Sequence, residues 1–403
     1  MQVNSHIPSI HLPGSKSISN RLLMIKAIGK LSFDIENCSD SDDTNSLIRV
    51  LQEIQNGATE IDIHHAGTNM RFLCSYLATR ERKKTILTGS ERMKERPVKE
   101  LVDALRSIGA EINYLNKDGY PPIEITGKKL QTSTIEIDAS VSSQFISSLL
   151  LIAPTFENGC TIILKGEVVS PGYITMTIKL IQEFGISVTW ENDTIKVENG
   201  EYHISSPSFF NESDWSAAGY FYNALLFSTK KEIKLTGLLQ NSIQPDSVSA
   251  KLFSQFGIET SFKNDAIILK KQTTSVSHFE YDFTDCPDIA QTLAITCFGS
   301  GITTKLTGLR TLKIKETDRI EALKNELEKF GAEIKNTIDS LEIIKLNSID
   351  KQKEINVQTY NDHRMAMSFA PLKYIYPNVQ IEDQQVVSKS FPKFWDELKK
   401  MEV

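Results

Sequence analysis

Six segments of the chain begin with a cluster of polar residues and then turn apolar on nearly every side, and this repeat constrains the fold more than any other feature. The six are KSISNRLLMIKAIG, GTNMRFLCSYLAT, SSQFISSLLLIAP, SDWSAAGYFYNALLF, PDIAQTLAITCFG and NDHRMAMSFAPLKYI. Comparable points within them lie 51, 75, 71, 73 and 75 residues apart. A helix that is apolar on every side belongs inside a core, so each segment predicts one buried helix.

A second kind of helix follows a strand that ends in a turn glycine, and it finishes near another glycine. In the best copy Ile320, Leu323, Leu327 and Phe330 share one helical face, and Gly331 supplies a left-handed C-cap. Three further helices are predicted to end in the same way, at Gly109, Gly185 and Gly257. These helices are amphipathic, so we expect them on the surface, each followed by a half-buried strand.

The repeat divides the chain into two domains of three units, each unit roughly 70 residues long. At 403 residues the chain exceeds one ordinary core. The hydrophilic stretch Glu201–Asp214 is the best crossing point, and the segment before Pro13 is a second one if the N-terminus joins the later domain. We therefore predict an α/β fold with a first domain at 15–212 and a second at 1–14 and 213–403.

Composition restricts the partners and the compartment. The chain has 45 Lys and Arg against 51 Asp and Glu, a net charge of −6, so its overall field would repel nucleic acid. The five cysteines form no Cys-x-x-Cys pair, which predicts reduced core thiols and no structural zinc. No apolar run approaches 18 residues and the first residues do not form a targeting signal, so we expect a cytoplasmic protein without membrane contact.

Polar residues that could bind a ligand or take part in catalysis lie at the starts of both kinds of helix. The stretch LPGSKSISNR shows the pattern, because Lys16, Ser17 and Arg21 lie where free N–H groups and the helix dipole favour a phosphate or carboxylate. Cations outnumber acids among these residues, which suits a ligand with several negative charges. Each residue also has an ordinary structural interpretation: Ser142 and Ser143 as caps, and Glu316 as an acid favoured by the dipole.

Nine segments in order resemble the signature segments of the 5-enolpyruvylshikimate-3-phosphate synthase family. They are LPGSKSISNR, AGTNMR, GSERMKERP, VSSQF, VSPGY, CPDIA, KIKETDR, YNDHRMAM and VVSKSFP. The resemblance implies an inverse α/β barrel-like fold of two domains, each with three βαβαββ repeats and buried helices, which close over the substrates. It also implies transfer of the enolpyruvyl group of phosphoenolpyruvate to the 5-hydroxyl of shikimate 3-phosphate, a step toward chorismate and the aromatic amino acids, and a target of glyphosate.

The resemblance also implies roles for individual residues. The catalytic residues it implies are Lys16, Asp288, Glu316 and Lys389. The contacts it implies for shikimate 3-phosphate are Lys16, Ser17, Arg21, Ser142, Ser143, Gln144, Ser170, Tyr173, Asp288 and Lys315. Those for phosphoenolpyruvate are Lys16, Gly67, Thr68, Arg96, Gln144, Arg319, Arg364 and Lys389. Addition followed by elimination needs an acid, a base and cations for the phosphate, so we expect no cofactor and no metal. We expect a monomer.

Three positions depart from the family pattern, and two other functions compete. His65 replaces an asparagine, Thr311 stands where an asparagine is common, and Phe72 follows Arg71 where a proline is usual. The nearest rival is a UDP-N-acetylglucosamine enolpyruvyl transferase, which would carry Lys-Asn in place of Lys16-Ser17 and a reactive loop cysteine. The other is a non-catalytic binder that keeps the same cleft. The joint presence of Lys16, Asp288 and Glu316 favours the enzyme.

Overall fold

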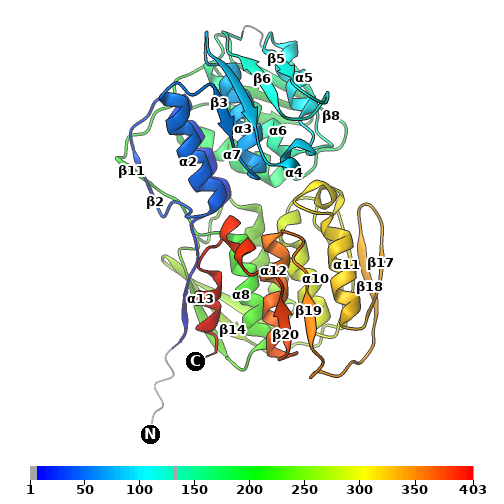
Figure 1. Ribbon diagram of the computed structural model, residues 1–403. Coiled ribbons are helices and arrows are strands. Elements are labelled where there is room, and N and C mark those ends of the chain that lie inside the picture. The colour runs from blue at the N-terminus through cyan, green and yellow to red at the C-terminus, as the bar shows by residue number, and fades with distance from the viewer. Residues whose placement is uncertain (1–6, 131–133, 403) are drawn as a thin grey trace. The chain divides into compact units, whose positions relative to one another are not determined.

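The chain forms two compact units in a computed structural model that describes residues 7–130 and 134–402. The N-unit comprises Lys16–Cys38 and Asp42–Asn211. The C-unit comprises Ser39–Ser41, Glu212–Val403 and the stretch that ends at Ser15. The chain therefore contributes to the C-unit before the N-unit begins, and the two units are described separately below (Figure 1).

The N-unit contains two four-stranded sheets of identical topology and one short sheet. The first has the order β3 (Glu60–Asp62), β4 (Lys84–Thr88), β6 (Ile123–Thr126), β5 (Glu111–Tyr114). The second has the order β7 (Thr134–Asp138), β8 (Cys160–Lys165), β10 (Thr194–Val197), β9 (Val188–Glu191). In both, the first pair of strands is parallel and the others are antiparallel. The third sheet pairs β11 (Ser208–Phe210) with β2 (Asp34–Glu36) in parallel.

The C-unit repeats this plan. Its first sheet has the order β1 (Ser9–His11), β12 (Glu232–Thr236), β14 (Ala266–Lys271), β13 (Ile258–Lys263). Its second has the order β15 (His278–Asp282), β16 (Thr303–Thr307), β18 (Leu341–Leu346), β17 (Ala332–Asn336). The short third sheet pairs β19 (Ile355–Val357) with β20 (Val379–Ile381) in parallel. Each unit thus has two full repeats and one reduced to two strands.

One buried helix belongs to each of the six repeats, as predicted. They are α1 (Lys16–Ile28), α3 (Gly67–Ala78), α6 (Ser143–Ile152), α8 (Trp215–Phe227), α10 (Ala290–Gly299) and α12 (His363–Phe369). Every residue of α3 except Thr68 is buried. In Figure 1, α8, α10 and α12 run side by side within the C-unit. Each large apolar side chain buried in this way contributes about 1.5–3 kcal/mol, so the helices form the core of each unit.

Strands and amphipathic helices cover the buried helices. The β7 strand alternates between exposed and buried residues, so one of its faces packs inward and the other meets water. The outer helices are α2 (Asp42–Gln55), α4 (Glu91–Lys94), α5 (Lys99–Ser107), α7 (Pro171–Glu183), α9 (Ser249–Ser254), α11 (Arg319–Lys329) and α13 (Phe394–Lys399). The predicted apolar face of α11 is buried, and Gly331 follows it with φ of 89°. A side chain would be strained in that conformation, which explains the glycine.

Four of the five cysteines lie in the core, as predicted: Cys74, Cys160, Cys286 and Cys297 are buried, whereas Cys38 is partly exposed. No disulfide is present among the described residues. Burial raises the pKa of the Cys74 thiol to about 12, so the reactive thiolate is disfavoured there. Within residues 7–130 and 134–402, no helix has the length and apolar character needed to cross a membrane.

Candidate active site

Lys16 is the first residue of α1 and reaches the first turn of α2. Its Nζ lies 3.0 Å from Oδ2 of Asp43, and 16% of its side chain remains exposed. The first turns of α1, α3 and α6 contain no acidic residue, so their dipoles favour an anion. Lys16 therefore combines a partly exposed ammonium group with a helix N-terminus.

Gly67 and Arg96 lie against each other at the start of α3. A Cβ atom added to Gly67 would be only 2.4 Å from Nη1 of Arg96, so any side chain there would displace the guanidinium. Arg71 fixes the surrounding backbone, because it donates hydrogen bonds to the carbonyl oxygens of Gly67 at 3.1 Å and Pro97 at 3.0 Å. Glycine at position 67 therefore allows the Arg96 guanidinium to lie directly against the start of α3.

A hydrogen bond joins the starts of α3 and α6. Nε2 of Gln144 donates to Oγ1 of Thr68 at 3.1 Å. The hydroxyl of Ser142 caps α6 by accepting from the backbone N–H of Gln144 at 3.3 Å, and Ser143 is buried beside it. Ser142 is therefore the cap that its sequence position suggested, and it also lies among the residues expected to bind substrate.

Arg21 is buried and joins α1 to α6 and α7. It donates to Oγ1 of Thr177 at 2.7 Å and to Oγ of Ser147 at 3.3 Å. It also donates to the carbonyl oxygens of Ser17 at 2.9 Å and Tyr173 at 3.3 Å. Burial lowers the pKa of Arg21 to about 10, which still leaves it charged at neutral pH.

Phe72, which replaces the usual proline, lies under this arginine. The guanidinium carbon of Arg21 is 5.4 Å from the centre of the Phe72 ring, within the range of a cation–π interaction. Ser170 precedes α7 and is also buried, with φ and ψ of 51° and 50° in the left-handed region. For a residue other than glycine this conformation is uncommon and marks functional segments more often than others.

Arg319 is the centre of a cluster of charges in the C-unit. Its Nε donates to Oδ2 of Asp362 at 2.6 Å, and its Nη2 donates to Oε2 of Glu316 at 2.8 Å. Its Nη1 lies 3.5 Å from Oδ1 of Asp288. Burial of the guanidinium would lower its pKa, but Asp362 and Glu316 outweigh that effect and the pKa is raised.

Three further ion pairs complete the cluster. Nζ of Lys389 lies 2.8 Å from Oε1 of Glu316, so two cations hold this carboxylate. Nη2 of Arg364 lies 2.8 Å from Oδ2 of Asp288, and Nζ of Lys315 lies 3.7 Å from Oδ1 of the same residue. The side chains of Glu316 and Asp288 are 15% and 16% exposed, so both can still meet a small ligand.

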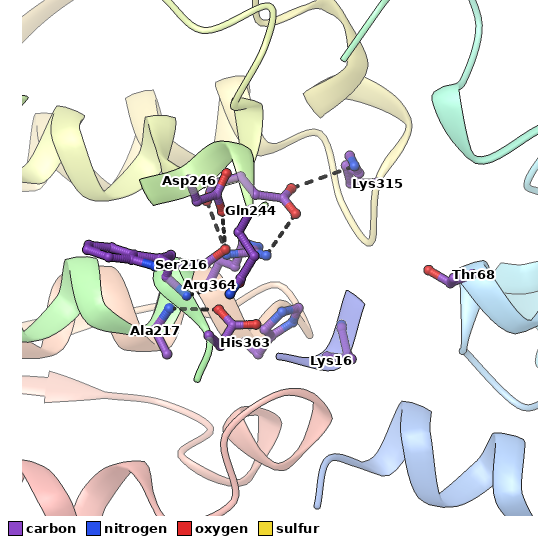
Figure 2. Close-up of polar contacts among 12 residues, drawn as sticks. Lys16, Thr68, Ser216, Ala217, Gln244, Asp246, Lys315, His363 and Arg364 are labelled. Carbon is purple, nitrogen blue, oxygen red and sulfur yellow. Dashed lines mark hydrogen bonds and ion pairs between the residues drawn. The ribbon is translucent and has the colours of Figure 1, made fainter. Parts of the chain in front are cut away.

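Asp246 is a member of this region that the sequence analysis missed. Figure 2 shows it beside Ser216, whose hydroxyl donates to its Oδ2. Burial raises the pKa of Asp246 to about 7, and the charge of Asp288 adds to the effect, while Arg364 opposes it. A carboxyl group with this pKa exchanges its proton near neutral pH.

A signal for Asp246 was present in the sequence. A Pro-Asp dipeptide begins two 3₁₀ helices, Pro245–Val248 and Pro287–Ile289, and the second contains Asp288, which was predicted. Asp246 and Asp362 also change the charge balance. The C-unit cluster holds four carboxylates, Asp246, Asp288, Glu316 and Asp362, and four cations, Lys315, Arg319, Arg364 and Lys389. It is therefore less cationic than the sequence pattern indicated.

Thr311 and His65, two of the departures from the family pattern, lie within a few residues of Lys315 and Gly67 in the sequence. Oγ1 of Thr311 is buried without a hydrogen-bond partner among the described residues, so the shorter side chain leaves a polar atom unsatisfied. His65 precedes the start of α3 and is exposed. Over the described ranges, no group of three His, Cys, Asp or Glu side chains could hold a metal ion.

The repeated sheets, the buried helices and the charged residues at their starts define an enolpyruvyl transferase type of fold. The structure of EPSP synthase from Acinetobacter baumannii matches it with a TM-score of 0.76 at 21% identity, covering 98% of this chain and 97% of that one. The family model for EPSP synthase (3-phosphoshikimate 1-carboxyvinyltransferase) matches residues 5–62 and 52–398. The chain belongs to the EPSP synthase family, which confirms the predicted family and fold class.

Curated relatives match over nearly their full length. A 3-phosphoshikimate 1-carboxyvinyltransferase of Bacteroides fragilis is 46% identical over 393 residues, covering 97% of this chain and 94% of the relative. One of Histophilus somni is 36% identical over 419 residues, covering 97% and 96%. One of Haemophilus influenzae is 35% identical over 419 residues, covering 98% and 96%. The rival assignment to a UDP-N-acetylglucosamine enolpyruvyl transferase is not favoured.

Proposed function

We propose that this chain transfers the enolpyruvyl group of phosphoenolpyruvate to the 5-hydroxyl of shikimate 3-phosphate and releases phosphate. Membership of the family over nearly the whole chain supports this reaction. The observation that carries the chemistry is Glu316, a carboxylate held by Lys389 and Arg319 at 2.8 Å each. Addition to an enol double bond needs a proton donor to carbon, and a positioned acid with a neighbouring lysine can supply one.

Glu316 and Lys389 act together in the proposed mechanism. Glu316 accepts a charge-assisted hydrogen bond from Arg319 and forms an ion pair with Lys389, so it is a carboxylate that must receive a proton before it can protonate the methylene carbon. Lys389 is proposed to supply that proton, because its Nζ lies 2.8 Å from Oε1 of Glu316. In the elimination step Glu316, again a carboxylate, takes a proton from the methyl group formed in the addition while phosphate leaves. Arg319 keeps the carboxylate oriented throughout.

Asp288 is proposed to orient the ring hydroxyls and to take the proton of the attacking 5-hydroxyl. Arg364 binds one of its oxygens at 2.8 Å and Lys315 lies 3.7 Å from the other. These cations fix the carboxylate and remain close to any phosphate or carboxylate bound there. The tetrahedral intermediate between addition and elimination would carry its negative charges among such groups, which is the largest usual source of catalysis.

Substrate binding is proposed for the following residues, some of which also have the catalytic roles given above. Phosphoenolpyruvate is assigned to five cations, of which only Lys16 is partly exposed, and to their neighbours. The full set is Lys16, Gly67, Thr68, Arg96, Gln144, Arg319, Arg364 and Lys389. Shikimate 3-phosphate is assigned to Lys16, Ser17, Arg21, Ser142, Ser143, Gln144, Ser170, Tyr173, Asp288 and Lys315. Because Arg21 is 2% exposed and already hydrogen-bonded, it would act mainly by adding positive potential and by fixing the Ser17 and Tyr173 backbones.

The wider context is proposed with the reaction. We assign 15–212 as the domain on the shikimate-phosphate side, and 1–14 with 213–403 as the domain of proton transfer. Closure of the domains over the substrates, a monomeric cytoplasmic enzyme, and the absence of any nucleic-acid or membrane partner belong to the same proposal. The pathway is that of chorismate and the aromatic amino acids, and glyphosate is the expected inhibitor.

One assay tests the function. Purified protein is mixed with phosphoenolpyruvate, and phosphate release is followed with and without shikimate 3-phosphate. We expect release only when shikimate 3-phosphate is present, and none when UDP-N-acetylglucosamine replaces it. Release that depends on the sugar nucleotide would favour the rival transferase, and no release with either acceptor would indicate a non-catalytic binder.

A further inference from the structure

A cavity of about 1020 Å³ lies in the N-unit at the carboxyl-terminal ends of α1 and α3. Its lining residues fall within 23–31, 48–55, 76–83, 128–130 and 155–156, all inside the N-unit. The α1 helix has 13 residues, so its two ends are about 18 Å apart. The cavity is therefore at the opposite end of α1 from Lys16, and none of the residues assigned above to the substrates lines it.

The lining contains an apolar group of residues, called the floor below, and a basic group, called the rim. The floor consists of side chains from two helices and two connecting segments: Leu23, Ile28, Leu31, Ile48, Leu51 and Phe156. Four of these, Leu23, Ile28, Leu31 and Ile48, are partly exposed. Ligand pockets in proteins usually have volumes of about 300–1,000 Å³, so this cavity is large enough for a small molecule. Its lining is more polar than that of a typical pocket.

The rim of the cavity is basic. Six lining residues are cations, Lys26, Lys30, Arg80, Lys83, Lys128 and Lys129, whereas Glu81 is the one acid among the lining residues. Lys128 and Lys129 form ion pairs at 3.2 and 3.1 Å with acids outside the lining. For the other four cations, no ion pair with a carboxylate is present in the part of the chain that the structure describes. This local excess of positive charge contrasts with the net charge of −6.

Two of these four cations, Lys26 and Arg80, donate hydrogen bonds to neutral oxygen atoms. Nζ of Lys26 donates to the carbonyl oxygen of Phe33 at 2.6 Å. Nη1 of Arg80 donates to the hydroxyl of Tyr76 at 3.1 Å, and its guanidinium carbon lies 5.6 Å from the centre of that ring. These contacts hold the cations in place without neutralising them, so each can still bind an anion.

The helix dipoles offer a simpler reason for the basic residues, but they explain only part of the arrangement. Cations near helix C-termini are favoured by about 0.3–1 kcal/mol, and Lys26 lies in the last turn of α1. The dipole effect does not explain why the cations line the same cavity as the apolar floor. A ligand with both an apolar part and an anionic group would contact the floor and the cations at the same time.

We propose that this cavity is a second binding site, which takes a small organic anion with a ring-sized apolar body. The body rests on the floor formed around Ile28, Ile48 and Phe156. A carboxylate or phosphate group on the ligand is held by Lys30, Arg80 and Lys83 at the rim. The site is separate from the candidate active site and does not depend on the reaction proposed above.

The probe for this site is 1-naphthyl phosphate, titrated into the full-length protein by isothermal calorimetry. We expect a dissociation constant below about 1 mM, and binding at least about tenfold weaker for 1-naphthol and for inorganic phosphate, which each lack one half of the recognised chemistry. Lys30→Glu with Lys83→Glu should weaken the probe by at least about tenfold. Lys179→Glu with Lys196→Glu makes the same charge change at two exposed positions of the N-unit outside the lining, and should leave binding unchanged.

Two further variants keep the proposal falsifiable. Ile48→Gln should weaken 1-naphthyl phosphate without weakening inorganic phosphate, because it changes only the floor. Lys16→Met should leave the affinity for 1-naphthyl phosphate unchanged. If that variant no longer binds the probe, the ligand lies at the candidate active site and the proposal is overturned. The proposal is also wrong if the wild-type protein does not bind the probe at 1 mM, or if inorganic phosphate binds equally well. Thermal melting of each variant checks that it is folded.

Discussion

The N-unit and the C-unit share a topology but hold their arginines in different ways. In the N-unit, Arg21 donates to two hydroxyls and two carbonyl oxygens, and none of the described carboxylates pairs with it. In the C-unit, Arg319 contacts Asp362, Glu316 and Asp288. Neutral partners leave a positive charge available to an anion, whereas carboxylate partners cancel it. This difference agrees with the proposed roles, in which the N-unit binds anions and the C-unit transfers protons.

The largest expected effect concerns proton transfer in the C-unit. Glu316→Gln keeps the shape of the side chain but removes the exchangeable proton, so turnover should fall by roughly two to four orders of magnitude. Affinity for shikimate 3-phosphate should be almost unchanged. Glu328→Gln, at an exposed position of the helix α11 that follows Glu316, is the matched control and should keep full activity. If Glu316→Gln turns over at a near wild-type rate, Glu316 is only an acid that the helix dipole favours. Lys16 or Lys389 would then have to deliver the proton.

The second prediction compares the two buried arginines. Arg319→Met leaves the buried Asp362 and its neighbours without their counter-charge, so the free energy of unfolding should fall by about 3–5 kcal/mol. Arg21→Met leaves only neutral groups, and should cost about 1–3 kcal/mol. Urea unfolding with a separate probe in each unit measures both values, since two units need not unfold together. Equal costs would contradict the distinction drawn between the units.

The third prediction is a pH dependence that comes from Asp246. Its pKa is raised from 3.8 to about 7, so between these values the folded protein keeps a proton that the unfolded chain has released. The stabilisation is present in full below pH 3.8, and the free energy of unfolding falls as the pH rises toward 7. Asp246→Asn should remove this pH-dependent loss. Between pH 4 and pH 7 its free energy of unfolding should therefore rise by about 1–3 kcal/mol relative to that of the wild type.

Asp396→Asn serves as the control for Asp246→Asn, because Asp396 lies in the C-unit and is 78% exposed. Its effect on stability should be the same at both ends of the pH range. Parallel pH profiles for the wild type and Asp246→Asn would show that Asp246 has an ordinary pKa in the folded protein.

The smallest effect concerns the position of a cation in the N-unit. Gly67→Ala places a Cβ atom 2.4 Å from Nη1 of Arg96, so the guanidinium has to move. The KM for phosphoenolpyruvate should rise by about tenfold with little change in the affinity for shikimate 3-phosphate. Inhibition by glyphosate should weaken more than substrate binding does. Unchanged values for both ligands would mean that Arg96 does not hold phosphoenolpyruvate.

Local sequence determined the secondary structure and the positions of most candidate residues. Apolar residues on every side of a segment can be satisfied only inside a core, so the six buried helices follow from periodicity alone. Their polar starts follow from the free N–H groups at a helix N-terminus, which is why Lys16, Ser17 and Ser142 could be found without a structure. Gly331 was predictable for a similar reason, because a left-handed C-cap favours glycine.

Tertiary structure alone decided which of these residues meet and what charge they leave. The pairing of β1 with β12 joins Ser9 to Lys234, and the sequence offered it only as a conditional possibility. Neither the hydroxyls around Arg21 nor the burial of Asp246 has a local pattern. The hydroxyls around Arg21 come from another repeat, and Ser216 lies 30 residues from Asp246 in the sequence. Whether an arginine binds an anion or neutralises an aspartate depends on these distant partners. The periodicity of apolar residues in the sequence indicates only which face of each helix or strand is buried.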